Sequence, residues 1–418
     1  MEQEFKEIIK NATYLTLTKG ITYIFPVFML GYLVKTLSIE SFGKYSIALT
    51  IGAYAQVIVD YGFSLTASRE VAKHRGFIVE LSRIYFETTI VRVLLGMIVY
   101  PFYYIACSKF IDDNSLLVSS QIAYAIVIGN TLFPVWFFQG IEKLGSIMFL
   151  NVFGKLISLA LIFIFVKEEN DVTNALLVQA IPLMIVSVVC NFLIINKYIK
   201  INGVIITMRG LLYSLKDGWS IFLSSISSVV LTNSAILILS STTTPHNVGL
   251  FAAAERLAKA ISGMFAPITQ AIYPYNCRKF SKSIPDGLRS VKRTGVPFIF
   301  LSGFILACIY LSSDLIGFFL NMKNESIYMF NIFLVWLFFG VVNNVLGIQI
   351  LCSSSHGNAY SKAFIICASI SMVLIYILCI KYAGVGAVIA ITLGEVFLML
   401  LLLYYIKVTL NVKFIYSR

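Results

Sequence analysis

Apolar residues dominate this chain of 418 residues in long runs that short polar segments separate. A helix needs roughly 20 apolar residues to cross the hydrocarbon core of a bilayer. Runs of about that length occur at 14–37, 44–62, 84–105, 116–138, 147–166, 175–195, 219–241, 249–273, 295–313, 327–352, 362–382 and 385–406. The pattern therefore predicts an all-α integral membrane protein with twelve transmembrane helices.

Basic residues alternate between the segments that join these runs. If the N-terminus is cytoplasmic, the cytoplasmic segments hold 21 of the 32 Lys and Arg residues, the external segments hold six, and five lie inside spans. Short loops rich in Lys and Arg stay on the cytoplasmic side of a membrane. We therefore expect a multi-pass protein of the inner (cytoplasmic) membrane with both termini in the cytoplasm.

The composition fits this class. Charged residues make up 12% of the chain and the mean hydropathy is +0.88, whereas soluble domains carry about 25% charged residues. The net charge of +12 follows from the basic loops, so we expect no nucleic-acid partner. The seven cysteines and three histidines have no metal-site or disulfide spacing, so we expect no metal and no cofactor.

A weak internal repeat divides the chain in two. Residues 43–48 (GKYSIA) resemble residues 249–254 (GLFAAA), and both segments open a predicted span after an external turn. We therefore expect six-helix bundles at 1–195 and 219–418, joined by a cytoplasmic linker at 196–218. Parallel repeats of this kind occur in transporters that hold the substrate between the halves.

The eighth predicted span carries charges that hydrocarbon disfavours. Arg256 and Lys259 share a helix face, and Lys259 lies about 15 Å from the outer end of the span at 1.5 Å per residue. A charge at the bilayer centre costs at least about 2.5–3.5 kcal/mol on insertion scales. Glu255 has the favourable i,i+4 order for a local pair with Lys259. That pair does not include Arg256, and we expect Arg256 to line a polar cavity.

Other basic residues inside spans allow two interpretations each. Lys19 is close enough to the inner surface to extend its ammonium group to the interface, or it faces a cavity. Arg92 and Lys155 each lie about eight residues into a span, where a structural pair and a substrate cavity are equally compatible with the sequence. All three are candidate substrate-binding residues.

Two acidic residues are candidates for ion coupling. Asp60 lies at the inner end of the second span, close to the basic segment 63–83, so an interfacial ion pair with that segment is the simpler interpretation. Glu395 lies in the middle of the last span with no local partner. Intramembrane carboxylates often mark proton or ion pathways, which makes Glu395 a candidate site for H⁺ or Na⁺.

The seventh predicted span carries a hydroxyl stripe that includes Ser224 and Ser228. Small polar residues of this kind either pack helices together or form a wall that hydrogen-bonds sugar hydroxyls. Asn343, Asn344 and Gln349 give a similar but weaker signal in the tenth span. The sequence leaves both interpretations open.

Three segments carry a resemblance to a known family: Asp60–Arg75 (DYGFSLTASREVAKHR), Phe133–Lys143 (FPVWFFQGIEK) and Ala266–Pro274 (APITQAIYP). In these motifs, and in its length and span order, the chain resembles the Wzx-type O-antigen flippases. These are polysaccharide transporters of the multidrug/oligosaccharidyl-lipid/polysaccharide exporter superfamily. The resemblance covers the whole chain, and its motifs do not specify the sugar.

The resemblance implies a function and a shape. Such proteins move undecaprenyl-diphosphate-linked repeat units from the cytoplasmic to the periplasmic leaflet, through a V-shaped cavity between two six-helix bundles that opens to either side in turn. Lipid II flippases of the superfamily place an arginine where Arg256-Leu257 stands here. Lys19 is similar to their basic residue in span one, whereas span two here has no buried Lys or Arg. The implied partners are the lipid-linked oligosaccharide, H⁺ or Na⁺, membrane lipids, a glycan polymerase and a chain-length regulator.

Three alternative functions remain open. A cation-coupled multidrug antiporter of the same superfamily would favour aromatic residues and carboxylates in its cavity, whereas the deep charges here are mostly basic. A membrane-bound glycan polymerase or ligase would carry a large external loop, and no segment between the predicted spans exceeds about 23 residues. A non-transporting scaffold would have no need of buried cations. We therefore expect a transporter and not an enzyme.

Overall fold

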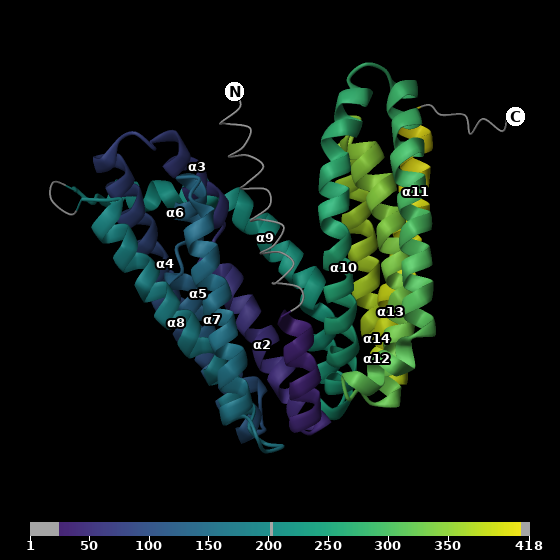
Figure 1. Ribbon diagram of the computed structural model, residues 1–418, viewed down its shortest axis with the longest axis horizontal. Coiled ribbons are helices and arrows are strands. Elements are labelled where there is room, and N and C mark those ends of the chain that lie inside the picture. The colour runs from purple at the N-terminus through teal and green to yellow at the C-terminus, as the bar shows by residue number, and fades with distance from the viewer. Residues whose placement is uncertain (1–24, 201–203, 411–418) are drawn as a thin grey trace, which may run out of the picture. The chain divides into compact units, whose positions relative to one another are not determined.

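The computed structural model describes residues 25–200 and 204–410, and these residues form helices and no strand. Contacts divide the chain into two compact units. The described residues of Thr36–Leu237 form the first unit, and those of Thr22–Lys35 and Ile238–Arg418 form the second. Within each unit the helices run side by side (Figure 1). The predicted bundles at 1–195 and 219–418, with their linker, stay a prediction.

The first unit is built around α5 (Asn114–Leu132), which packs against α2 (Ile39–Asp60), α4 (Ile78–Phe110) and α8 (Val172–Lys197). Its other helices are α3 (Phe63–Lys73), α6 (Val135–Gly140), α7 (Leu144–Phe165) and most of α9 (Met208–Thr242). Two polar caps begin these helices: Ser38 Oγ accepts from the Ser41 N–H and Asp113 Oδ1 from the Ser115 N–H. Such caps satisfy N–H groups that a helix start leaves unpaired.

An aromatic core closes one end of the first unit. The buried side chains of Phe63, Tyr85, Trp136 and Phe137 pack together there. Two of the three sequence motifs, Asp60–Arg75 and Phe133–Lys143, form α3 and α6 and so meet in this core. The two helices approach closely because Gly140 has no side chain: a Cβ there would lie 2.7 Å from the Ser68 carbonyl oxygen. Much of the family signature therefore encodes packing.

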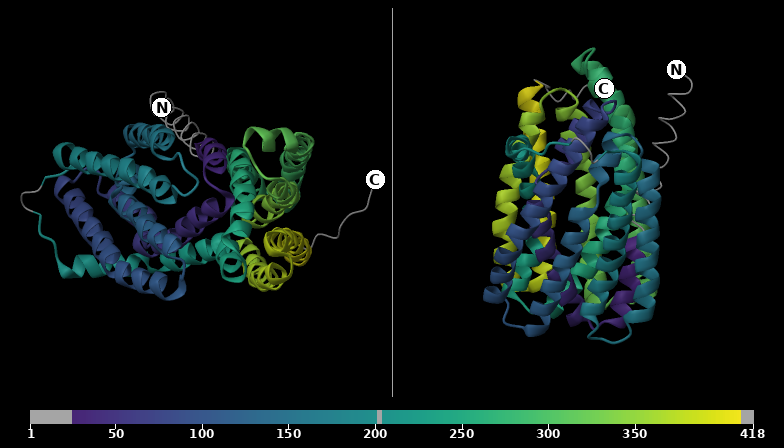
Figure 2. Two further views of the ribbon diagram at one scale, coloured as in Figure 1. Left: turned by 90° about the horizontal axis from the view of Figure 1, so that it is seen from below. Right: turned by 90° about the vertical axis from the view of Figure 1, so that its left-hand side faces the viewer.

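The second unit comprises the short helix Phe25–Thr36, α10 (Pro245–Phe280), α11 (Ile284–Leu311), α12 (Ser313–Phe319), α13 (Asn324–Asn343), the π-helix η1 (Asn344–Cys352) and α14 (Gly357–Thr409). Figure 2 shows its long helices, in green and yellow, packed side by side. α10 packs against α11, α13 and α14, and α13 packs against α14. α10 therefore packs against three long helices of its own unit.

α14 is a hairpin of two helices. Ala383 departs from helical geometry, with φ 49° and ψ −132°. The two arms lie against each other, since Cys367 Sγ donates to the Gly394 carbonyl oxygen at 2.9 Å. The close return requires Gly386, where a Cβ would lie 2.0 Å from the Leu378 carbonyl oxygen. The arms correspond to the predicted spans 362–382 and 385–406.

The described helices bear out a multi-pass membrane protein. Eight are long and apolar enough to cross a bilayer, or nine if α9, which bends by 46° between Ile221–Val230 and Thr232–Thr242, is one span. α10 is long enough to cross a bilayer but is not one of these apolar helices. It carries Glu255, Arg256 and Lys259 within five residues. A count of twelve spans and the side on which each terminus lies stay predictions.

Candidate functional site

Arg92 is fully enclosed in the first unit and is held by α5 and α2. Its side chain is 5% exposed. Its Nη2 donates to Asp60 Oδ1 at 3.2 Å and to the Asn130 carbonyl oxygen at 3.0 Å. Its Nη1 donates to the Phe133 carbonyl oxygen at 3.5 Å. Because α5 ends before Pro134, which has no N–H to donate, the Asn130 carbonyl accepts one backbone bond, from the Phe133 N–H, and has a lone pair left for Arg92. Arg92 therefore joins three helices.

Asp60 pairs with Arg92 instead of the basic segment 63–83. The cations of that segment have other partners: Arg69 with Asp217, Lys73 with Glu70, Arg75 with Glu142 and Arg83 with Glu80. The geometry thus favours the structural pair for Arg92, one of the two interpretations that the sequence left open, and gives Asp60 a different partner from the one the sequence suggested.

α10 carries three charged residues within five positions, Glu255, Arg256 and Lys259. Lys259 Nζ lies 3.0 Å from Glu255 Oε1, so the predicted i,i+4 pair is present. The Glu255 side chain is 7% exposed and that of Lys259 43% exposed. Arg256 is half-buried, beside an alanine-rich stretch whose residues 252–254 are completely buried. Small residues thus pack the helix closely while Arg256 keeps part of its surface open.

Glu395 lies in the second arm of α14 and is half-buried. Asn343 Nδ2 donates to Glu395 Oε2 at 2.5 Å and to the Glu395 carbonyl oxygen at 2.9 Å. Glu395 and Trp336 line a cavity of about 260 Å³ between α10, α13, η1 and α14. The described hydrogen bond to the carboxylate thus comes from α13, and four elements line the cavity beside it.

The same cavity borders an irregular helix and a buried polar chain. Asn344 lines the cavity and begins η1, and π-helical turns often occur at functional sites. Gln349 Nε2 donates to the carbonyl oxygen of Thr269, another lining residue, at 3.0 Å. Gln349 Oε1 accepts from Asn276 Nδ2 at 2.9 Å. The third sequence motif, Ala266–Pro274, thus borders the Glu395 cavity.

The remaining candidates are placed as follows. Ser224 and Ser228 are exposed on α9, so helix packing among the described residues does not cover their hydroxyl face. Lys155 is half-buried on α7. Lys19 lies outside the described residues. The sequence had not marked Trp336, because this residue type does not stand out in an apolar span, and it had marked Thr269 only as part of the motif Ala266–Pro274.

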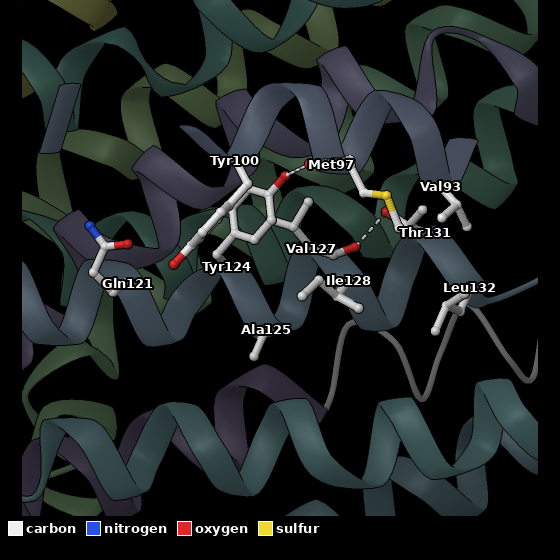
Figure 3. Close-up of a pocket in the computed structure, with 11 residues that line it drawn as sticks. Val93, Met97, Tyr100, Gln121, Tyr124, Ala125, Val127, Ile128, Thr131 and Leu132 are labelled. Atoms are coloured by element: carbon white, nitrogen blue, oxygen red, sulfur yellow. Dashed lines mark hydrogen bonds between the residues drawn. The ribbon is translucent and has the colours of Figure 1, made fainter. Parts of the chain in front are cut away.

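The first unit contains a larger, mostly apolar cavity of about 580 Å³ between α4 and α5. Figure 3 shows Met97 and Tyr100 of α4 facing Tyr124 and Ile128 of α5 across it. Tyr124 donates its hydroxyl hydrogen to the Gly96 carbonyl oxygen at 2.6 Å. No candidate charge lines this cavity, so its chemistry suits hydrocarbon.

Solved structures share this fold. An inward-facing multidrug transporter of the MATE family matches with a TM-score of 0.73 at 14% identity, covering 94% of this chain and 96% of that chain. The lipid II flippase MurJ in an inward closed conformation matches with a TM-score of 0.71 at 14% identity, covering 96% of this chain and 87% of that chain.

Sequence relatives give the family. A protein of Escherichia coli K12 described as "Putative O-antigen transporter" is 26% identical, over 95% of this chain and 96% of its own length. A protein of Shigella dysenteriae with the same description is 28% identical, over 95% of this chain and 100% of its own length. The family model for polysaccharide biosynthesis proteins matches residues 8–280. The resemblance seen in the sequence motifs is confirmed, and the chain belongs to this family of polysaccharide biosynthesis proteins.

Proposed function

We propose that this protein is a flippase that moves undecaprenyl-diphosphate-linked O-antigen repeat units from the cytoplasmic to the periplasmic leaflet of the inner membrane. The observation that carries the proposal is the similarity to described O-antigen transporters over 95% of the chain. The likeness to a lipid flippase supports a compatible fold and no more. The protein acts as a transporter and not as an enzyme.

The proposed substrate explains the cations inside the spans. A diphosphate carries negative charge that hydrocarbon excludes, and charge-assisted hydrogen bonds from basic residues offset its lost hydration. Arg256 is the principal diphosphate ligand because its planar fork fits two phosphate oxygens. Lys259, Lys19 and Lys155 supply further positive charge, and Arg92 does so only if it leaves Asp60.

Transport follows an alternating-access cycle. Twelve helices in two bundles form a cavity that opens to the cytoplasm and then to the periplasm, with both termini cytoplasmic. The hydroxyls of Ser224 and Ser228 hydrogen-bond the sugars, and the polyprenyl tail stays in the bilayer. An interior-negative potential favours outward movement of the anion by about 2.3 kcal/mol per charge per 100 mV. A glycan polymerase and a chain-length regulator are the proposed partners.

Glu395 couples transport to H⁺ or Na⁺. Three features support this proposal: the carboxylate lines a cavity, it lies within a candidate membrane span, and its described hydrogen-bond donor is the neutral amide of Asn343 on α13. A neutral shell leaves the charge of the carboxylate available for a cation. Asp60 is a weaker candidate because Arg92 already balances its charge.

A deletion strain complemented with variants tests the flippase. Replacing Arg256 with alanine should lower surface glycan about tenfold or more, since a hydrogen bond to a charged group contributes about 1.5–3 kcal/mol. Arg256→Lys, which keeps the charge, should restore part of the export. Normal glycan with Arg256→Ala at equal protein level would contradict the site.

The deletion strain itself separates the alternatives. Without a flippase, polyprenyl-linked repeat units should accumulate at the inner leaflet. Their disappearance would instead indicate an enzyme of their synthesis. If drug resistance rises with expression of this protein while the amount of surface glycan does not, the protein is a multidrug antiporter. The MATE-like fold also accommodates that function.

A further inference from the structure

A small polar pocket in the first unit lies apart from the residues used above. It has a volume of about 60 Å³ and is bordered by α3, α4 and the beginning of α9. Its titratable lining comprises Glu70, His74, Arg83, Glu87, Tyr213 and Asp217. A polar cavity of this size has room for water. The motif Asp60–Arg75 contributes Glu70 and His74, so part of the family signature faces this pocket.

Glu87 is the group in this pocket whose charge is least balanced. It is 6% exposed, and its Oε1 is buried with no hydrogen-bond partner among the described residues. An ionised carboxylate buried in this way carries a free-energy cost unless donors or water satisfy it. Proton uptake from water in the pocket removes that cost.

The neighbouring charged groups are already engaged. On α3, Glu70 pairs with Lys73 and Arg69, and His74 Nδ1 lies 2.9 Å from the Glu70 carbonyl oxygen. On α9, Asp217 pairs with Arg69 at 2.7 Å. These pairs engage the charged residues that α3 and α9 contribute to the pocket wall, and the α9 cations Arg209 and Lys216 are exposed and do not line it.

On α4, Arg83 is the cation nearest to Glu87 in sequence, and it pairs with Glu80 at 2.8 Å. Tyr213 of α9 adds a neutral hydroxyl to the pocket wall. No group of acidic, histidine and cysteine side chains suited to a metal ion occurs in the described residues. The chemistry of the pocket therefore favours a proton over a metal.

The Glu87 carboxylate also supports the start of α9. The helix begins at Met208, beside this carboxylate. Gly210, in the first turn, packs directly on it, since a Cβ there would lie 1.9 Å from Glu87 Oε1. A negative charge at a helix N-terminus stabilises the helix. The ionised carboxylate thus anchors the first turn of α9 to α4.

We propose that Glu87 is a protonation site that takes up a proton through this pocket, and that the uptake loosens the first turn of α9 from α4. The anchor is present when Glu87 is ionised, at higher pH, and is lost as the pH falls. α9 runs from the first unit into the second, with the boundary after Leu237. The proton would therefore act on the helix that both units share. This inference does not depend on the transported substrate.

Hydrogen exchange of the full-length protein in lipid nanodiscs tests the proposal. Exchange over residues 204–217, corrected for the intrinsic pH dependence of exchange, should become about fivefold faster as the pH falls, the effect of losing a helix-capping contact. Glu87→Gln should abolish this pH dependence. Glu142→Gln, which neutralises an exposed carboxylate outside the pocket, should retain it. The same pH response in Glu87→Gln and wild type would overturn the proposal.

A second measurement tests the proposal if the Glu87→Gln variant does not fold. Glu87→Asp keeps the carboxyl group but withdraws it by one methylene. Infrared difference spectra between two pH values should contain a C=O band of the protonated carboxylic acid. This band should differ between wild type and Glu87→Asp, either in frequency or in the midpoint pH at which it appears. Identical bands in the two proteins would overturn the proposal.

Discussion

Replacing Arg92 with methionine is expected to destabilise the first unit by about 3 kcal/mol. The guanidinium makes two hydrogen bonds of ordinary length, to Asp60 at 3.2 Å and to Asn130 at 3.0 Å. Removing one partner of a buried ion pair costs about 3–5 kcal/mol. The Asp60 side chain is 32% exposed, so water partly replaces the lost partner and the effect falls at the lower end of that range. Methionine keeps much of the apolar stem, which limits the loss of packing.

Thermal unfolding of the purified protein measures this effect. For a domain of 150–250 residues, 1 kcal/mol shifts the melting temperature by about 2–4 °C, so Arg92→Met should lower it by about 6–12 °C. Arg92→Lys keeps the charge but cannot reach all three acceptors, so it should give an intermediate shift. A double-mutant cycle with Asp60→Asn should show coupling, because the two residues contact each other directly.

Two results would refute this reasoning. A shift below about 2 °C for Arg92→Met, under 1 kcal/mol, would mean that the pair does not stabilise the unit. If the changes in unfolding free energy of Arg92→Met and Asp60→Asn add fully in the double variant, the contact between the two residues does not contribute to stability. If Arg92→Met folds normally and export alone is lost, Arg92 instead binds substrate.

Three further predictions follow from particular contacts. Glu395→Gln should leave the melting temperature nearly unchanged but abolish the response of export to the coupling ion, measured with H⁺ or Na⁺ gradients; an unchanged response would exclude Glu395. A hydrogen bond from Lys44 holds the pKa of Asp113 below its ordinary value, so this pair contributes stability above the ordinary pKa of about 3.9, and the contribution is lost as the pH falls through the lower, folded value. Asp113→Asn should remove that acid-dependent part, which we expect to be about 1 kcal/mol for a pair at the edge of the unit that is partly exposed to solvent, as thermal unfolding at several pH values would show; an unaltered pH profile would contradict the pairing. Gly386→Ala should destabilise the second unit by about 3 kcal/mol or more, because its Cβ meets backbone at 2.0 Å; a melting temperature equal to wild type would contradict the close hairpin return.

Local features of the molecule follow directly from the sequence. The length of the apolar runs predicts helices that cross a bilayer, and described helices lie at the predicted positions. The pair of Glu255 and Lys259 is equally local, since one helical turn brings the two side chains together whatever surrounds them. The break at Ala383 separates the last two predicted spans and follows from the short gap between two apolar runs.

The partners of the other charges depend on which helix faces meet. Arg92 and Asp60 are 32 residues apart, and Asn343 and Glu395 are 52 residues apart. Almost every face of a membrane helix is apolar, so hydropathy shows that a segment is buried in the membrane but not which neighbour each face contacts. The sequence therefore marked Glu395 as lacking a local partner, and the fold supplied Asn343 and a cavity. Glu87 received no role from the sequence, because its lack of a balancing charge arises only when α3, α4 and α9 pack around it and the nearby cations pair elsewhere.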